Sequence, residues 1–250
     1  MHWRSIFTIC TGFCLIACGG SVDRSAAGAP APALTSEAST ALRILVIGGT
    51  SGIGLETVKL ALDRGHSVTA MARRPERMTL THERLETFGG DILDGEAVEA
   101  AMAGHGAVVT TISIGPTRNP VSLFSEGTGN VLAAMQKLGI GQLIAVTGIG
   151  AGDSRGHGGL FYDRILQPLA LKTAYEDKDR EEELIRASET DWTIVRPGHL
   201  TDDSSETRYR VISDLEGITS GKIARADVAH FIVSALELRS YSDATVLLTN

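Results

Sequence analysis

A short apolar segment followed at once by a glycine-rich loop constrains this chain most. Residues 43–47 (RILVI) have the composition of a buried strand, and residues 48–54 (GGTSGIG) follow without a linker. Apolar residues then recur at helical spacing over residues 52–64. Glycines allow a tight turn and close backbone approach, and the N–H groups that begin a helix attract anions, so this order predicts a dinucleotide-binding turn. The residues expected to hold the pyrophosphate are Gly48, Thr50, Ser51, Gly52, Ile53 and Gly54.

Apolar runs alternate with amphipathic segments along the rest of the chain. Strands are expected at 43–47, 67–72, 84–88, 107–112, 143–147, 192–195 and 245–248. Helices are expected at 52–64, 94–103, 121–138, 175–188 and 226–238. This alternation is typical of parallel β-α-β units, so we predict a single-domain α/β fold with a Rossmann-like, doubly wound parallel sheet and helices on both faces. Residues 199–221 are polar and irregular, and we expect them to cap the site.

The N-terminal segment has the pattern of a targeting signal. An apolar run over residues 6–17 is too short for a permanent membrane span but fits the core of a signal peptide. It ends in LIAC at Cys18, followed by GGS, and this resembles the lipobox of bacterial lipoproteins. The resemblance implies a signal peptide over residues 1–18 and a lipid on Cys18. The expected location is therefore the periplasmic side of a membrane, with the outer membrane favoured because Gly19 follows the cysteine; a cytoplasmic location is the alternative.

The organisation of the remaining chain follows from composition. Residues 19–41 are rich in Ala, Gly, Ser and Pro without apolar periodicity, which is typical of a flexible tether. The NAD(P)-binding domain is expected over residues 42–250. The three cysteines lie at positions 10, 14 and 18, so this domain has no disulfide, thiolate nucleophile or cysteine-ligated metal.

Charge and motif content exclude several other functions. The chain has 23 Lys and Arg against 30 Asp and Glu, a net charge of -7, which argues against a nucleic-acid partner. The seven histidines are scattered without an HExxH motif, so no metal site is expected. No G-x-S-x-G motif supports a serine hydrolase. The expected partner is a small molecule, with membrane contact through the lipid on Cys18.

The basic end of the second expected strand bears on cofactor choice. A site that prefers NAD usually has a carboxylate about 20 residues after the glycine loop, where it binds the ribose 2′-hydroxyl. Here Arg73 follows Gly54 by 19 residues, and Arg74 is adjacent. Guanidinium groups at this place favour the 2′-phosphate of NADP, so NADP (NADPH) is expected and NAD is less favoured. The alternative is a basic turn that is merely solvated.

Five motifs, in order, resemble the atypical, NmrA-like branch of the short-chain dehydrogenase/reductase superfamily. They are the G-x-x-x-G-x-G loop at 48–54, G-D-x-x-D at 90–94, the strand end T-I-S at 111–113, W-T-I-V-R-P-G at 192–198 and R-x-D-V-A at 225–229. Ser51 replaces the middle glycine of that branch's GATGxxG loop. The resemblance implies that Asp91 lies near the adenine and that Pro197 turns the chain past the nicotinamide. Thr111 and Ser113 end a strand at the edge of the sheet where the nicotinamide half is expected. Asp94 is expected to cap the next helix.

The catalytic pair of the superfamily is incomplete. Its main families use Ser, Tyr and Lys, with Tyr four residues before Lys on one helix face. Lys178 occupies the lysine position, but the tyrosine position falls on Ala174, and Tyr175 is displaced by one residue, about 100° around a helix. Lys178 is expected either to bind the nicotinamide ribose or to belong to a solvated, charged helix face.

Further catalytic candidates are Tyr175 as proton donor and Thr147, at the family's serine position, as a group that orients a carbonyl; alternatively, Thr147 bonds the backbone at a strand end. His157 lies in a glycine-rich loop and is either an acid or an exposed residue without a role.

The sequence therefore predicts an NADPH-dependent oxidoreductase that reduces a small flavin-, quinone- or carbonyl-type acceptor. A flavin or quinone needs no precisely placed acid, which would explain the incomplete pair. The alternative is a non-catalytic NADP-binding sensor or interaction module. A sugar-nucleotide epimerase is less favoured, because those enzymes have the full pair and a larger C-terminal domain.

Overall fold

The computed structural model describes residues 29–30 and 41–250. The predicted signal peptide and Cys18 lie outside these residues, as does most of the predicted tether, so the lipid anchor stays a prediction. Within the described ranges, no helix has both the length and the apolar character needed to cross a membrane.

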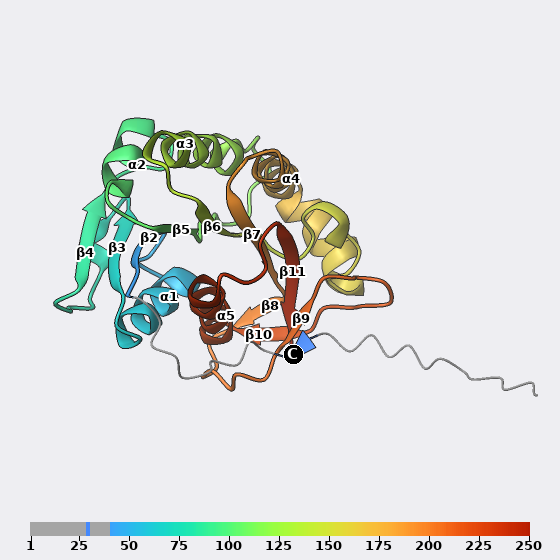
Figure 1. Ribbon diagram of the computed structural model, residues 1–250. Helices are drawn as coiled ribbons and strands as arrows, with labels where there is room; N and C mark the ends of the chain where they lie inside the picture. The colour runs from blue at the N-terminus through green and yellow to red at the C-terminus, as the bar shows by residue number, and fades with distance from the viewer. Residues whose placement is uncertain (1–28, 31–40) are drawn as a thin grey trace, which may run out of the picture.

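Among the described residues, nine strands form one sheet in the order β1-β9-β11-β7-β6-β5-β2-β3-β4 (Figure 1). Their bounds are β1 Ala29–Pro30, β2 Arg43–Ile47, β3 Ser67–Ala72, β4 Leu85–Gly89, β5 Ala107–Thr110, β6 Gln142–Val146, β7 Asp191–Pro197, β9 Arg210–Ile212 and β11 Ala244–Thr249. The seven strands from β11 to β4 in this order pair parallel with their neighbours. At the other end of the sheet, β9 pairs antiparallel with β11 and with β1. The central strands are buried along their length, as expected for a sheet covered on both faces.

Helices cover both faces of the sheet (Figure 1). On one face lie α1 (Gly52–Asp63) and α5 (Arg225–Leu238), and on the other lie α2 (Gly95–Met102), α3 (Leu123–Leu138) and α4 (Lys172–Arg186). Each face has its own cluster of buried hydrophobic side chains. The predicted doubly wound α/β fold is confirmed. Asp94 caps α2 as expected, since its carboxylate accepts bonds from the backbone N–H groups of Glu96 and Ala97 at 3.1 Å.

Two segments differ from expectation. A π-helix, Tyr162–Leu171, precedes α4 directly and contains Pro168, which cannot donate to an i−4 carbonyl. Residues 199–221 were expected to be irregular throughout, but they contain two short strands, β8 (His199–Thr201) and β9. Strand β8 pairs parallel with β10 (Lys222–Ala224), a partner that local sequence does not reveal.

The order of strands reverses between β2 and β5. From β2 the chain continues outward to β3 and β4, and from β5 it continues in the other direction to β6 and β7. Ligands of open α/β sheets bind in the crevice outside the carboxyl ends of strands at such a switch point. The glycine loop follows β2, and Thr111 follows β5, so both border this crevice.

Candidate cofactor and active site

A cleft of two adjoining pockets follows the carboxyl edge of the sheet. The first, of about 240 Å³, lies over the ends of β2, β3 and β4, and we call it the adenosine half. The second, of about 430 Å³, lies over the ends of β2, β5, β6 and β7, and we call it the acceptor half. The halves share Ser51, Thr111, Ile112 and Ser113, so they form one elongated site. This shape suits a dinucleotide laid across the switch point.

The glycine loop is shaped by backbone conformation and close packing. Gly48 and Gly52 have φ values of +90° and +56°, which side chains with a Cβ disfavour. A Cβ on Gly54 would lie 2.3 Å from the Gly48 carbonyl oxygen, so Gly54 lets α1 pack against the turn. The Thr111 hydroxyl donates to the Ile47 carbonyl oxygen at 3.2 Å and thereby joins the segment after β5 to the end of β2, where the loop begins.

The first turn of α1 presents its N–H groups to the cleft. Ser51 is the N-cap residue, but its side chain makes no capping bond, and the first turn carries no acidic residue. Unsatisfied N–H groups and the positive end of the helix dipole are the usual receptor for a phosphate. Of the six residues predicted to hold the pyrophosphate, Gly54 lines neither half and packs against the turn instead, whereas the other five line the cleft: Gly48, Thr50, Ser51, Gly52 and Ile53.

Three arginines line the adenosine half. The predicted Arg73 and Arg74 are joined by Arg77, which the sequence analysis missed. Arg77 ends the 3-10 helix Pro75–Arg77, and that turn, begun by a proline, brings its side chain back to the pocket. Asp91 lines the same pocket, and its Oδ1 accepts a bond from the Leu93 N–H at 3.1 Å.

Aromatic and aliphatic side chains dominate the acceptor half. Tyr175, the predicted proton donor, lines it, and so does Tyr162 of the π-helix. The Tyr162 hydroxyl lies 2.8 Å from the Tyr175 hydroxyl and 3.0 Å from the carbonyl oxygen of Ile149. It carries one hydrogen, and when it donates this to Tyr175, the hydrogen of Tyr175 remains free for a ligand. The His199 ring packs edge-on against Tyr162 at 5.3 Å between centroids, and its Nε2 donates to the Gly158 carbonyl oxygen at 2.8 Å.

Both tyrosines are neutral at physiological pH. Burial raises the pKa of Tyr175, and the hydrogen bond from Tyr162 offsets only part of that rise. Burial, together with the neighbouring Tyr175, also raises the pKa of Tyr162. Tyr175 can therefore donate a hydrogen bond to a ligand, but it is a weak acid for proton transfer.

The structure does not place Lys178 with Tyr175. The Lys178 Nζ lies 4.0 Å from the ring centroid of Phe124 in α3 and 3.9 Å from Glu181 Oε2, and Lys178 lines neither half of the cleft. The alternative of a solvated helix face is also wrong, because the side chain is buried. Burial lowers the pKa of Lys178 and raises that of Glu181 to about 7. Lys178 thus packs between α3 and α4, where it cannot lower the pKa of Tyr175 by direct contact.

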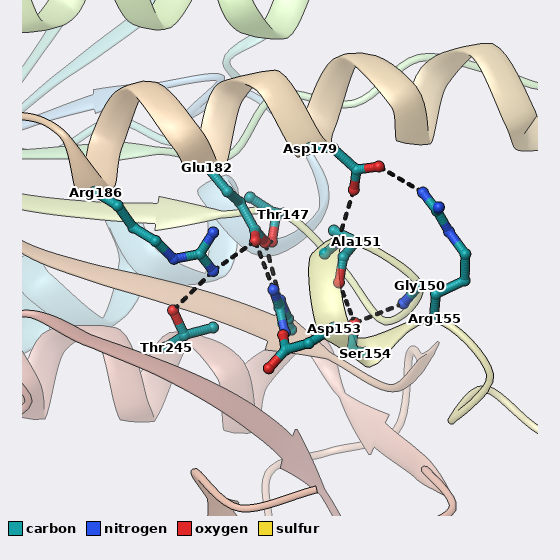
Figure 2. Close-up of polar contacts among 12 residues, drawn as sticks. Thr147, Gly150, Ala151, Asp153, Ser154, Arg155, Asp179, Glu182, Arg186 and Thr245 are labelled. Atoms are coloured by element: carbon teal, nitrogen blue, oxygen red, sulfur yellow. Dashed lines mark hydrogen bonds and ion pairs between the residues drawn. The ribbon is translucent and has the colours of Figure 1, made fainter.

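Thr147 lines the acceptor half, but its hydroxyl is already used. It donates to Glu182 Oε1 at 2.8 Å (Figure 2). A hydroxyl carries one hydrogen, so Thr147 in this arrangement cannot also donate to a substrate carbonyl. Neither the predicted carbonyl-orienting role nor the alternative of a backbone bond describes it.

A buried ion pair explains the arginine of the W-T-I-V-R-P-G motif. Arg196 bonds Glu182 through two parallel contacts, Nε to Oε1 at 2.9 Å and Nη2 to Oε2 at 2.6 Å, and it also pairs with Asp153. Arg196 is 1% exposed. Burial alone would raise the pKa of Glu182, but the hydrogen bonds and charge of Arg196 outweigh it and lower the pKa. The pair joins β7 to α4 beneath the acceptor half.

The remaining predicted residues divide between the cleft and its supports. Pro197 and Ser113, which were predicted to lie near the nicotinamide, line the acceptor half. His157 is half-buried, and its Nδ1 donates to the Ile218 carbonyl oxygen at 2.7 Å, so it is neither idle nor part of the cleft lining. Tyr162, His199 and Arg225 line the acceptor half and were missed as site residues. Arg225 could have been predicted from the sequence, since it is the first residue of the R-x-D-V-A motif.

Comparisons with known proteins agree with this geometry. The model of a family described as NAD(P)H-binding matches residues 48–238. The "Uncharacterized sugar epimerase YhfK" of Bacillus subtilis (strain 168) is 28% identical over 218 residues, covering 83% of this chain and 94% of that protein.

Solved structures similar to this chain include the following two. The anaerobillin reductase ChuY of Escherichia coli O157:H7 has a TM-score of 0.69 and 25% identity, covering 83% of this chain and 96% of that one. A short-chain dehydrogenase/reductase of Veillonella parvula in complex with NADP has a TM-score of 0.70 and 16% identity, covering 84% and 95%, and this likeness concerns the fold alone.

Proposed function

Because the chain belongs to the NAD(P)H-binding family, we propose that it is an NADPH-dependent oxidoreductase that reduces a small, planar acceptor of the flavin or quinone type. The observation that carries the proposal is the two-part cleft, with three arginines in one half and a tyrosine without a lysine partner in the other. The similarity to a reductase of E. coli supports reduction as the reaction class.

The residues of the adenosine half fit a dinucleotide that carries a 2′-phosphate. The uncapped start of α1 supplies N–H donors for the pyrophosphate, and Gly54 lets that helix pack closely against the turn. Arg73, Arg74 and Arg77 supply guanidinium groups, which bind phosphate in a bidentate manner. We assign Asp91 to the adenosine.

The acceptor half supplies orientation more than acid catalysis. When bound, NADPH supplies a hydride. Ile112, Leu171 and Leu200 exclude water from the planar acceptor, and the Tyr175 hydroxyl donates a hydrogen bond to one of its polar atoms. Since burial raises the pKa of Tyr175 and Lys178 is buried elsewhere, the proton is expected to come from solvent. Carbonyl reduction, which requires an acid at the nascent alkoxide, is less favoured.

The function is tested by following NADPH absorbance with the purified chain and a set of flavins, quinones and simple aldehydes and ketones. We expect turnover with a flavin or quinone and little with the carbonyl compounds. NADPH binding without turnover of any acceptor would favour the sensor alternative, which the incomplete Tyr–Lys pair supports. Turnover of carbonyl compounds alone would contradict the proposed acceptor class.

Replacing Arg73 by alanine is expected to weaken NADPH binding by about tenfold to a hundredfold, the worth of one or two charge-assisted hydrogen bonds. NADH, which lacks the 2′-phosphate, should bind the variant and the wild type about equally. Nicotinamide fluorescence gives both affinities, and Arg43→Ala, on the amino side of β2, is the matched control. An equal loss for the two cofactors would contradict the assignment of Arg73.

Replacing Tyr175 by phenylalanine is expected to lower the turnover of a quinone or flavin by less than about tenfold, because the tyrosine orients and does not donate the proton. For the same reason, wild-type turnover should not fall between about pH 7 and pH 9, since burial moves the Tyr175 pKa above its ordinary value of about 10. Steady-state rates across this range check both statements. A loss of about a hundredfold in the variant would assign the proton to Tyr175, whereas a wild-type rate that falls before pH 9 would show that a group other than Tyr175 titrates in the reaction.

A further inference from the structure

We propose that Arg225 binds the cofactor phosphate on the nicotinamide side of the pyrophosphate, and that Asp202 competes with that phosphate for the same guanidinium. The inference rests on the proposed function, because it concerns the same cleft and the same dinucleotide.

The position of Arg225 supports the first half of the inference. It is the first residue of α5 and lines the acceptor half together with Ser51, Gly52 and Ile53. A Cβ built on Gly52 would lie 3.8 Å from the Arg225 Nε. The side chain therefore stands beside the first turn of α1, whose N–H groups are uncapped by Ser51. A guanidinium and a helix N-terminus that face one space form a receptor for an anion held between them.

The two halves of the cleft are lined by different arginines. Arg73, Arg74 and Arg77 line the adenosine half, and Arg225 does not. Arg225 lines the acceptor half, in which none of those three arginines takes part. The glycine loop is common to both. A dinucleotide has a phosphate on each side of its central bond, so this division assigns Arg225 to the phosphate that carries the nicotinamide ribose.

The partner of Arg225 is easily displaced. The Nη1 of Arg225 donates a hydrogen bond to Asp202 Oδ1 at 2.7 Å. Among the described residues, this is the side-chain hydrogen bond that the Arg225 guanidinium makes. The Asp202 side chain is 91% exposed, whereas that of Arg225 is 29% exposed. An ion pair with one fully hydrated partner contributes little, and a guanidinium has five N–H donors. A phosphate can therefore replace Asp202, or bind beside it while the carboxylate weakens the attraction.

Two substitutions that should change the NADPH affinity in opposite directions test the inference. Arg225→Ala is expected to weaken NADPH binding by about tenfold or more, with Arg225→Lys intermediate. Asp202→Asn is expected to tighten NADPH binding by about two- to fivefold, because the competing charge is removed. Asp203→Asn, one residue along the chain, is the matched control and should leave the affinity unchanged. Fluorescence titration of the full chain measures all of these without turnover.

Adenosine 2′,5′-bisphosphate serves as the second probe. It has the adenosine and its two phosphates but no nicotinamide phosphate. Arg225→Ala should weaken its binding less than that of NADPH, whereas Arg73→Ala should weaken both. A structural role for the Arg225–Asp202 pair predicts instead that Asp202→Asn weakens NADPH or has no effect, and this result would overturn the inference. Equal losses for the two probes in Arg225→Ala would overturn it as well.

The failure of the proposed function would look different. If the wild type binds NADPH and the substitutions behave as stated, but no acceptor is reduced, the reductase assignment fails and the role of Arg225 stands. If the wild type reduces an acceptor and Arg225→Ala binds NADPH as well as the wild type, only the inference fails. Absence of NADPH binding by the wild type would overturn both.

Discussion

Replacing Arg196 by alanine is expected to lower the free energy of unfolding by about 3 kcal/mol, the low end of the range for breaking a buried ion pair. The buried Glu182 carboxylate loses its bidentate partner and keeps only the Thr147 hydroxyl and the partly exposed Arg186. The carboxylate accepts both parallel bonds from Arg196, and its side chain is 0% exposed. The expected cost exceeds the net worth of the pair itself, since part of it is the desolvation of a carboxylate that has lost its bidentate partner.

Urea unfolding measures this change, and the chain offers a control at the same carboxylate. Arg186 also contacts Glu182 Oε2, at 2.8 Å, but its side chain is 36% exposed, so Arg186→Ala should cost less than about 1 kcal/mol (Figure 2). Substituting both partners of the buried pair, Arg196→Met with Glu182→Leu, should recover much of the lost stability. If Arg196→Ala lowers the free energy of unfolding by less than about 1 kcal/mol, water reaches Glu182 and the pair contributes little to stability.

The stability from this pair also has a defined pH dependence. The pKa of Glu182 is lowered in the folded protein, so the carboxylate stabilises the fold above the ordinary glutamate pKa of about 4.3. That contribution is lost as the pH falls through the lowered folded-state value. The difference between wild type and Arg196→Ala should therefore be full at neutral pH and shrink in acid.

Replacing Gly54 by alanine is expected to abolish measurable NADPH binding and to cost about 3 kcal/mol of stability, near the top of the range for overpacking. The new Cβ would lie 2.3 Å from the Gly48 carbonyl oxygen and 2.5 Å from the Thr111 Oγ1. The first of these atoms belongs to the backbone, so α1 or the turn must move. Either movement displaces the N–H groups that face the cleft.

A second glycine in a helix separates crowding from a general effect of alanine. Gly129 lies in α3, and a Cβ there would meet no atom within 4 Å. Gly129→Ala should therefore leave NADPH binding unchanged and raise stability by about 0.5–1 kcal/mol, because alanine favours the helix. Thermal unfolding and fluorescence titration of the two variants give the comparison. Normal NADPH binding by Gly54→Ala would contradict the packing described for the loop.

The parts of the site that the sequence predicted lie next to strand ends. The glycine loop, Arg73 and Ser113 each follow a strand within a few residues, and a parallel sheet brings such ends to one edge. Their place could therefore be derived from local patterns alone.

The parts that were missed depend on contacts between distant segments. Tyr162, His199 and Arg225 come from a π-helix, a short strand and the start of α5, and only the folded chain brings them together. The hydrogen bond of the Thr147 hydroxyl is likewise determined by Glu182, which lies 35 residues away in the sequence. Lys178 illustrates a further limit, since its direction depends on how α4 packs against α3, and spacing along one helix does not determine that.

Titration of the purified chain with NADPH and NADH, followed by nicotinamide fluorescence, tests the assignment of the cleft most directly. The arginines of the adenosine half predict saturable binding of NADPH that is at least about tenfold tighter than that of NADH, the difference expected from one charge-assisted contact to the 2′-phosphate. Equal affinities would contradict the preference for NADP. Absence of binding by either cofactor would contradict the dinucleotide site itself and, with it, the proposed reductase function.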